Sequence, residues 1–357
     1  MSWLLTILGF CALIVLHEFG HFTAAKLTGM RVERFLLFFP PALVKTRRGE
    51  TEYGIGAIPL GGMVKITGMN PREEIPEEVK PRAYYRQPVW KRIVVISAGP
   101  AMNILVAFVL LYAVFLVNGA GQPTRTVDAK GLEAPAAGVL MPGDRIVSVD
   151  GKSGSQETFA RAISAHHCPG RPTNGCAATT PARVTVVRHG RRLTFAITPR
   201  YDDRAGRTRI GFAFHVRPID TNPGNSARYS VDTMWQVTTA TGSAIARIFE
   251  PAQRKQIGSV VGASKVTQQA FGYGVSDALR VLAIISLSLA LVNLFPFLPL
   301  DGGHIFWALA EKVRGRPVPF EVMERAGVVG FALVLMLFFI GLTNDIDRLR
   351  GAGFPTR

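Results

Sequence analysis

Four long apolar runs constrain this chain more than any other feature of its sequence. They extend over about residues 3–29, 93–117, 281–300 and 326–343. Each has about the 18–25 residues that a helix needs to cross the hydrocarbon core of a bilayer. Soluble proteins bury apolar helices, but they rarely need four runs of this length. The sequence therefore predicts a multi-pass α-helical membrane protein with about four transmembrane helices.

Basic charge is concentrated beside these runs. The chain has 41 Lys and Arg against 25 Asp and Glu, a formal net charge of +16, which in a soluble protein would suggest a nucleic-acid partner. Here many basic residues lie at 31–92 and between the last two runs, where the positive-inside rule places cytoplasmic loops. Both termini and the long segment 118–277 are then predicted to be extracytoplasmic, although Arg348, Arg350 and Arg357 would lie outside against that rule.

The segment between the second and third runs has the pattern of a small α+β domain. Residues 145–151 predict a strand, 156–165 a helix, and 182–197 a hairpin that turns at His189-Gly190. An extracytoplasmic location permits oxidation of cysteines. Two cysteines lie close together in this segment and are predicted to form a structural disulfide: Cys168 and Cys176.

Two further segments are expected to lie in or against the membrane. Residues 52–68 are apolar, strand-like and rich in glycine. A cytoplasmic hairpin would fit them, but their hydrophobicity favours a re-entrant β-loop shielded by protein or a wet cavity, with a free edge for an unwound substrate. Residues 224–277 have apolar side chains at helical spacing and predict amphipathic helices on the membrane surface or against the inserted domain.

The sequence His17-Glu18-Phe19-Gly20-His21 is the strongest chemical signal. Histidines at i and i+4 share one face of a helix, so both imidazoles can bind one metal ion. Glu18 is placed to act as general base toward a water at that metal. The cluster lies within a predicted span, where polar groups are costly and usually functional, although a cluster that only joins helices would have the same composition.

A hydrolytic zinc site usually has three protein ligands, so a third must come from elsewhere in the chain. The end of the third run supplies a candidate in the sequence Asn-Leu-Phe-Pro-Phe-Leu-Pro-Leu-Asp-Gly-Gly-His at 293–304. Spans one and three run in the same direction, so the histidines and Asp301 can meet at one depth. Pro296 and Pro299 are expected to break the helix beside the site. Zinc is preferred, although iron or cobalt would suit the same ligands.

With these motifs the chain resembles the site-2 protease family of intramembrane zinc metalloproteases. The resemblance rests on the HExxH motif of the first span, the Gly-Pro-x-x-Asn motif at 99–103 in the second, and the motif at 293–304 in the third. Residues 123–200 are similar to bacterial PDZ domains through the run at 134–151. The order of these parts most resembles the bacterial branch, which trims regulators such as anti-sigma factors after a first protease has acted.

This resemblance implies a Zn²⁺ site formed by His17, His21 and Asp301, with Glu18 as the general base. It implies that Asn293 contacts the substrate backbone or stabilises the transition state. The glycines of the re-entrant loop that would bind substrate are Gly56, Gly61 and Gly62. His304 is expected to have a local structural role and not to bind the metal.

The resemblance also implies partners and a location. Substrates would be single-span membrane proteins similar to anti-sigma factors, together with remnant signal peptides. The PDZ-like domain would bind an extended peptide or a C-terminus, and no nucleic-acid partner is expected. The chain would lie in the bacterial inner (plasma) membrane, with its termini and PDZ-like domain outside the cytoplasm.

The predicted segments follow one another in a simple order. They are a first transmembrane helix with HExxH (1–29), a cytoplasmic and re-entrant β-loop region (30–92), a second transmembrane helix (93–118), a PDZ-like domain (123–218), amphipathic helices (219–277), a third transmembrane helix with a metal-binding Asp at its end (278–300), a cytoplasmic loop (301–326) and a fourth transmembrane helix (327–343).

Two other functions fit parts of this pattern. A catalytically inert membrane scaffold would use the PDZ-like domain alone, but the intact Glu18 argues against a retired protease. A metal transporter would show paired repeats and more intramembrane carboxylates than this sequence has. Zinc content combined with peptide cleavage distinguishes all three functions.

Overall fold

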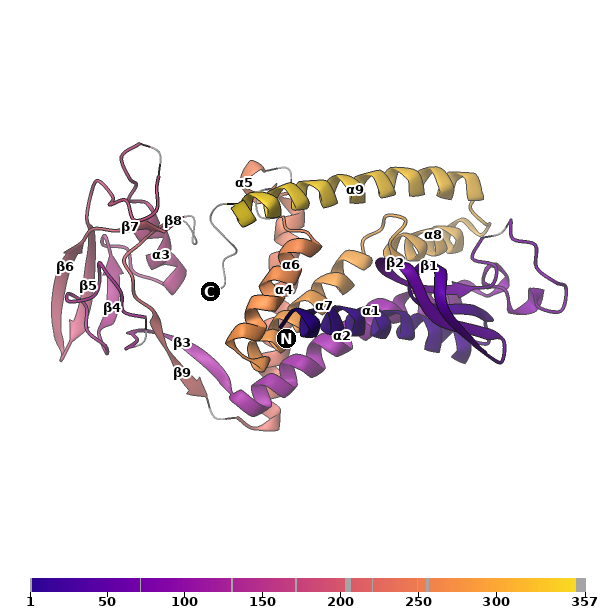
Figure 1. Ribbon diagram of the computed structural model, residues 1–357, viewed down its shortest axis with the longest axis horizontal. Helices are drawn as coiled ribbons and strands as arrows, with labels where there is room; N and C mark the ends of the chain where they lie inside the picture. Colours follow the sequence, from indigo (N-terminus) through magenta and orange to yellow (C-terminus); the bar gives the residue numbers. More distant parts are fainter. Residues whose placement is uncertain are drawn as a thin grey trace. The chain divides into compact units, whose positions relative to one another are not determined.

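The computed structural model describes residues 2–350 except 71, 130, 171, 203–206, 220, 249 and 255–256, so Arg357 lies outside the described residues. The chain divides into two compact units. One contains residues 1–116 and 223–344, and the other contains residues 117–222 together with the C-terminal residues. Figure 1 labels their helices and strands.

Four helices in the described part of the chain are long and apolar enough to cross a membrane. They are α1 (Ser2–Leu27), α2 (Val89–Asn118), α7 (Val275–Asn293) and α9 (Phe320–Arg350). Large apolar side chains such as Leu105 and Phe331 are exposed on them, as lipid-facing surfaces require and as water would disfavour. The chain is therefore a multi-pass helical membrane protein, as its apolar runs predicted.

The third span differs from its predicted boundaries. The sequence predicts a helix over 278–300 with the aspartate at its end, whereas α7 stops at Asn293. Pro296 and Pro299 follow in a loop, because neither ring nitrogen can donate to a helical carbonyl. Asp301 is instead the first residue of a separate helix, α8 (Asp301–Arg314).

The chain after Asp301 is also more helical than predicted. Much of the expected cytoplasmic loop at 301–326 belongs to α8. The fourth span, predicted at 327–343, begins at Phe320 and continues to Arg350. Apolar patterning could locate this span but not its polar ends, since those residues extend the helix without adding hydropathy.

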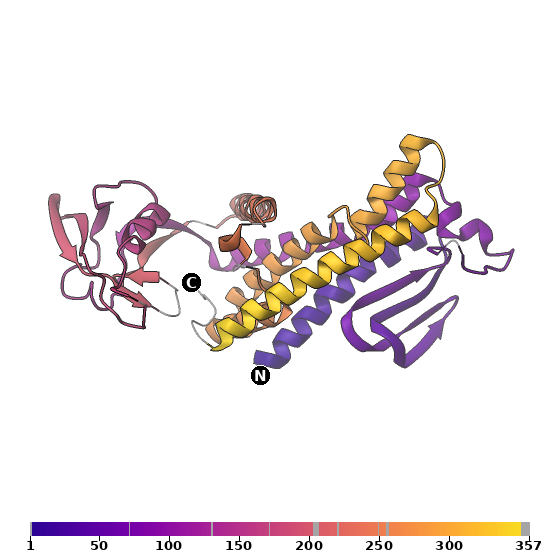
Figure 2. The same ribbon diagram turned by 90° about the horizontal axis from the view of Figure 1, so that it is seen from above.

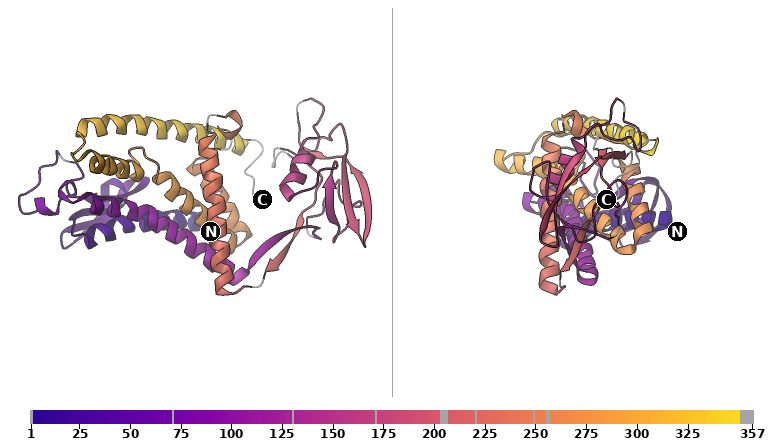
Figure 3. Two further views of the ribbon diagram at one scale, coloured as in Figure 1. Left: turned by 180° about the vertical axis from the view of Figure 1, so that it is seen from behind. Right: turned by 90° about the vertical axis from the view of Figure 1, so that its left-hand side faces the viewer.

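The remaining helices of the first unit are shorter or less apolar. They are α4 (Pro223–Ala246), α5 (Pro251–Arg254) and α6 (Val260–Tyr273). The helix α6 packs against α1 and α7, and α4 packs against α7. Figures 1 and 3 show α4 running across the direction of α9.

Strands β1 (Val32–Arg48) and β2 (Thr51–Ile66) form a folded-over antiparallel sheet. Both strands bend, so residues 34–37 of β1 pair with 52–55 on one side and with 62–65 on the other. The end of β2 therefore forms an outer edge of this sheet. Figure 2 shows the sheet beside the C-terminal half of α1, which carries the two histidines.

Ionic contacts fix the turn between these strands. Glu50 accepts two hydrogen bonds from Arg82, at 2.7 and 2.8 Å, and one from Lys26 at 2.6 Å. Arg82 belongs to a short 3₁₀ helix (Lys80–Arg82) that precedes a second one (Tyr84–Arg86). These bonds, with those from Arg82 foremost, hold the pKa of Glu50 at about 2. The carboxylate therefore remains ionised and ties the turn to the end of α1.

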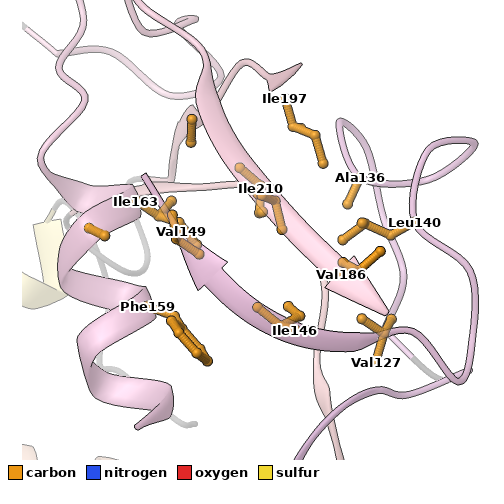
Figure 4. Close-up of a cluster of buried hydrophobic side chains, with 13 residues drawn as sticks. Val127, Ala136, Leu140, Ile146, Val149, Phe159, Ile163, Val186, Ile197 and Ile210 are labelled. Atoms are coloured by element: carbon orange, nitrogen blue, oxygen red, sulfur yellow. The ribbon is translucent and has the colours of Figure 1, made fainter. Parts of the chain in front are cut away.

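The second unit is built on an antiparallel five-stranded sheet in the order β6-β5-β4-β3-β9. Its strands are β3 (Ala120–Val127), β4 (Arg145–Val149), β5 (Ala182–Arg188), β6 (Arg191–Ile197) and β9 (Phe214–Ile219), with a separate pair β7 (Arg200–Asp202) and β8 (Arg207–Arg209). Phe159 on α3 (Gln156–Ser164) is fully buried, and Figure 4 shows it beside Ile146 and Val149 of β4. This unit therefore has a hydrophobic core of its own.

Two local predictions in this unit agree with the structure. Strands β5 and β6 form a hairpin whose two-residue loop is His189-Gly190. Both loop residues have positive φ, 49° and 78°, as a tight hairpin turn requires. Cys168 and Cys176 are joined by a disulfide.

Candidate metal centre

The candidate metal centre combines one face of α1 with the first residue of α8. His17 and His21 are one helical turn apart and are only 8% and 7% exposed. Asp301 lies opposite them, although 280 residues separate it in sequence from His21. The three side chains form the metal-ligand cluster found among the described residues.

The spacing of the three ligand atoms fits a tetrahedral ion. The Nε2 atoms of His17 and His21 are 3.3 Å apart, and each lies 3.3 Å from Asp301 Oδ2. Ligands bound at zinc distances of about 2.0–2.1 Å in tetrahedral geometry would be roughly 3.3 Å apart. Asp301 Oδ2 is also buried without a hydrogen-bond partner among the described residues. A bound cation would stabilise such an oxygen.

The helix α2 supports the histidines from behind. His21 Nδ1 donates to the Val95 carbonyl at 2.9 Å, which leaves the Nε2 lone pair free for a metal. His17 Nδ1 lies 3.1 Å from the side-chain amide of Asn103. Both rings therefore turn Nδ1 toward α2 and Nε2 toward Asp301.

Two glycines allow these helices to approach so closely. A Cβ at Gly20 would lie 2.3 Å from the Ala98 carbonyl oxygen, and a Cβ at Gly99 would lie 2.2 Å from His21 Nε2. No larger residue fits either position without moving α1 away from α2. The glycine inside HExxH and the glycine of Gly-Pro-x-x-Asn thus face each other's helix.

The folded-over sheet meets the centre at Glu18. A Cβ at Gly62 would lie 2.3 Å from Glu18 Cγ, so the edge of β2 packs directly on the glutamate. The other two predicted loop glycines are elsewhere: a Cβ at Gly56 would meet the Phe39 carbonyl oxygen at 2.2 Å, and Gly61 lies beside the Phe39 ring. Of the three, the structure brings Gly62 to the site.

Asn293 also reaches the centre. It is the last residue of α7, and its amide nitrogen lies 3.4 Å from His17 Nε2. His304 is in the first turn of α8 and is outside the metal-ligand cluster. The sequence analysis included Asn103 in the Gly-Pro-x-x-Asn motif but did not predict its contact with His17. The signal that could have indicated it was a polar residue within a motif on an apolar helix.

Comparison with known proteins identifies the family. Residues 5–337 match the sequence model of Peptidase family M50. The chain belongs to peptidase family M50. This confirms the predicted membership of the site-2 protease family, and with it the class of metalloprotease.

Relatives that match this chain over most of its length are named as zinc metalloproteases or putative zinc metalloproteases. A putative zinc metalloprotease of Rhizobium meliloti is 29% identical over 95% of this chain and 94% of its own length. The zinc metalloprotease Rip1 of Mycobacterium tuberculosis is 32% identical over 93% of this chain and 94% of its own length. A putative zinc metalloprotease of Nostoc is 32% identical over 98% and 97%. Zinc is therefore the expected cofactor, in agreement with the ligand geometry.

Proposed function

We propose that this family M50 member is an intramembrane zinc protease that hydrolyses peptide bonds within or near transmembrane helices of membrane-anchored regulators. One observation carries the proposal: two histidines and a glutamate lie on a helix apolar enough to span a membrane, and the histidines meet a third metal-ligand group, Asp301, from α8. Polar groups at such a depth are costly and are usually retained for function.

The chain's own residues divide the chemistry between them. His17, His21 and Asp301 hold the zinc, which when bound supplies a Lewis acid that polarises a peptide carbonyl and makes water more acidic. Glu18 accepts the proton of the attacking water and passes it to the leaving amine. The amide of Asn293, beside His17, donates a hydrogen bond to the substrate carbonyl as negative charge develops on it.

The edge of β2 is the proposed docking site for the substrate backbone. Residues 62–65 pair with β1 on one side only, and Gly62 touches Glu18. A peptide bond must leave the helical conformation before it can be cleaved, and an added strand supplies hydrogen bonds to the unwound segment. In this proposal the sheet is a re-entrant β-loop, since its backbone would be shielded by the surrounding helices.

The inserted sheet unit is proposed to be a PDZ-like domain that binds an extended peptide or a C-terminus. The disulfide within it fits an oxidising compartment. The basic segments at 31–92 and 312–325 would then face the cytoplasm, with both termini and the inserted unit on the outer side of a bacterial inner membrane. Substrates in this scheme are anti-sigma-factor-like proteins already trimmed by a first protease, and remnant signal peptides.

Glu18→Gln tests the proposal most directly. The variant should retain bound zinc and lose nearly all cleavage of a single-span substrate in detergent or liposomes, because no carboxylate remains to accept the proton. His17→Ala with His21→Ala should lose the zinc itself. Comparable turnover by Glu18→Gln would move the base elsewhere, and full zinc occupancy in the double variant would overturn the ligand assignment.

A further inference from the structure

The side chain of Asn103 is a buried polar group that the proposed chemistry does not use. It lies in the middle of the apolar helix α2 and is 0% exposed. Its amide nitrogen is 3.1 Å from His17 Nδ1, while its amide oxygen is buried without a partner among the described residues. An unsatisfied oxygen at that depth is expensive, so the placement calls for a function.

The geometry of His17 decides which amide atom can serve it. His17 Nε2 faces His21 Nε2 and Asp301 Oδ2 at 3.3 Å, so Nε2 is the atom directed at the metal. A neutral imidazole that binds through Nε2 carries its hydrogen on Nδ1. His17 Nδ1 must therefore donate, and it needs an acceptor on α2.

His21 supplies an internal comparison for this requirement. Its Nδ1 faces the Val95 carbonyl oxygen, which can only accept. Val95 and Asn103 lie on the same helix, two turns apart, and each meets the Nδ1 atom of one histidine. At His17 the corresponding acceptor is the amide oxygen of Asn103. A half-turn of the amide about its Cβ–Cγ bond exchanges oxygen and nitrogen without displacing the backbone.

A second contact holds Asn103 in place. Ser286 on α7 donates from Oγ to the Asn103 backbone carbonyl at 2.9 Å. This bond ties α7 to α2 but leaves the side-chain amide free to serve His17. Ser286 therefore offers a matched control, since it touches the same residue through a different atom.

From these contacts we infer that Asn103 is a positioning residue for the metal centre: its amide oxygen accepts a hydrogen bond from His17 Nδ1 and thereby directs Nε2 at zinc. This inference rests on the ligand set of the proposed function. The partner of a metal-binding histidine fixes the tautomer and orientation of the ring, and its loss typically weakens metal binding by about 10- to 100-fold.

Zinc affinity of the purified full-length protein, measured by competition with a chelator, tests the inference. Asn103→Leu removes the acceptor and should weaken zinc binding about 10- to 100-fold. Asn103→Asp retains an acceptor and should bind zinc at least as tightly as the wild type. Ser286→Ala should bind zinc like the wild type. Asn103→Ala repeats the loss with a smaller side chain should the leucine variant fail to fold.

Two results would overturn the inference. One is wild-type affinity in Asn103→Leu or Asn103→Ala, and the other is an equal loss in Asn103→Asp and Asn103→Leu, which would mark a purely structural role. Both leave the ligand assignment standing as long as His17→Ala loses zinc. Retention of zinc by His17→Ala would instead refute the ligand assignment.

Discussion

At the scale of single residues, the position of Glu18 depends on the small size of Gly62, which lies beside it. Gly62 has no side chain, and this absence lets the edge of β2 lie against Glu18. Glu18 is thereby held between its own helix and the strand proposed to bind the substrate. In the proposed mechanism, the distance between Glu18 and the scissile bond is then set by the packing of α1 against β2.

Gly62→Ala should slow cleavage without changing zinc binding. The added methyl would lie 2.3 Å from Glu18 Cγ, so the glutamate or the strand must shift by about 1 Å, a displacement that can cost about 100-fold in rate. Zinc content should not change, because the three ligands are untouched. Gly242→Ala on α4 meets nothing within 4 Å and is the matched control. Wild-type cleavage by Gly62→Ala in a single-turnover assay would show that this contact does not position the base.

A buried ion pair between Asp144 and Arg188 stabilises the inserted unit. Asp144 is 1% exposed and accepts hydrogen bonds from Arg188 Nε and Nη2 at 2.8 and 2.7 Å. Burial by itself would raise the pKa of Asp144, but the bonds from Arg188 and from the Met141 amide hold it below its usual value. The pair's stabilisation is therefore complete at neutral pH and is lost as pH falls through that lowered pKa.

Arg188→Met should expose this dependence. It leaves a buried carboxylate without its partner and should lower the free energy of unfolding of the sheet unit at pH 7. The difference from the wild type should begin to shrink below about pH 4 and be lost as pH falls through the lowered pKa of Asp144, where the carboxyl is protonated and no longer attracts the guanidinium. Hydrogen exchange of β4 and β5 measures it. Arg183→Met, an exposed position on the same strand, is the control; a pH-independent difference would contradict the assignment.

At the scale of helices, the metal centre depends on how α8 is held. Asp301 begins α8, and Glu311 near its other end receives two hydrogen bonds from Arg92 on α2, at 2.9 and 2.6 Å. The two side chains are 11% and 23% exposed. Since α2 also contacts both histidines, this ion pair joins the helix that carries Asp301 to the helix that supports His17 and His21.

Glu311→Gln should therefore affect both stability and metal binding. Removing the charge of Glu311 leaves the buried Arg92 without an opposite charge and should lower the free energy of unfolding by about 3 kcal/mol or more. The double variant Arg92→Met with Glu311→Met should recover most of this loss. Zinc affinity should fall in the single variant, because α8 is less firmly held. Lys312→Met, an exposed neighbour, is the control. Thermal unfolding with chelator competition checks both effects, and unchanged zinc affinity in an unstable Glu311→Gln would limit the pair to a structural role.

The sequence predicted which residues meet at this centre better than it predicted the elements that hold them. Periodicity and spacing identified His17, Glu18 and His21, because helical geometry alone brings them to one face. Asp301 was identified by its motif, but its place at the start of a separate helix was not. The double pairing of β1 and the contact of Gly62 with Glu18 were also beyond reach, since both depend on tertiary packing that local preferences do not encode.

At the scale of the whole molecule, the candidate metal centre and the inserted unit are formed by different parts of the chain. The described groups of the metal centre all come from residues outside 117–222. The unit enters through β3 and leaves through β9, and Ala120 pairs directly with Ile219. Cross-strand partners lie only about 5 Å apart, so residues 121–218 can be replaced by a short Gly-Ser linker. The unit's hydrophobic core would be removed complete.

This deletion tests whether the unit filters substrates by size. In the proposed function this unit lies on the outer side of the membrane, so a target with a bulky outer domain is expected to be excluded while a trimmed one is admitted. The deleted protein should cleave a pre-trimmed single-span substrate at the wild-type rate and should cleave the untrimmed form faster. Loss of cleavage of the trimmed substrate with zinc still bound would contradict this expectation and would mean that the unit delivers substrates, as a peptide-binding domain does.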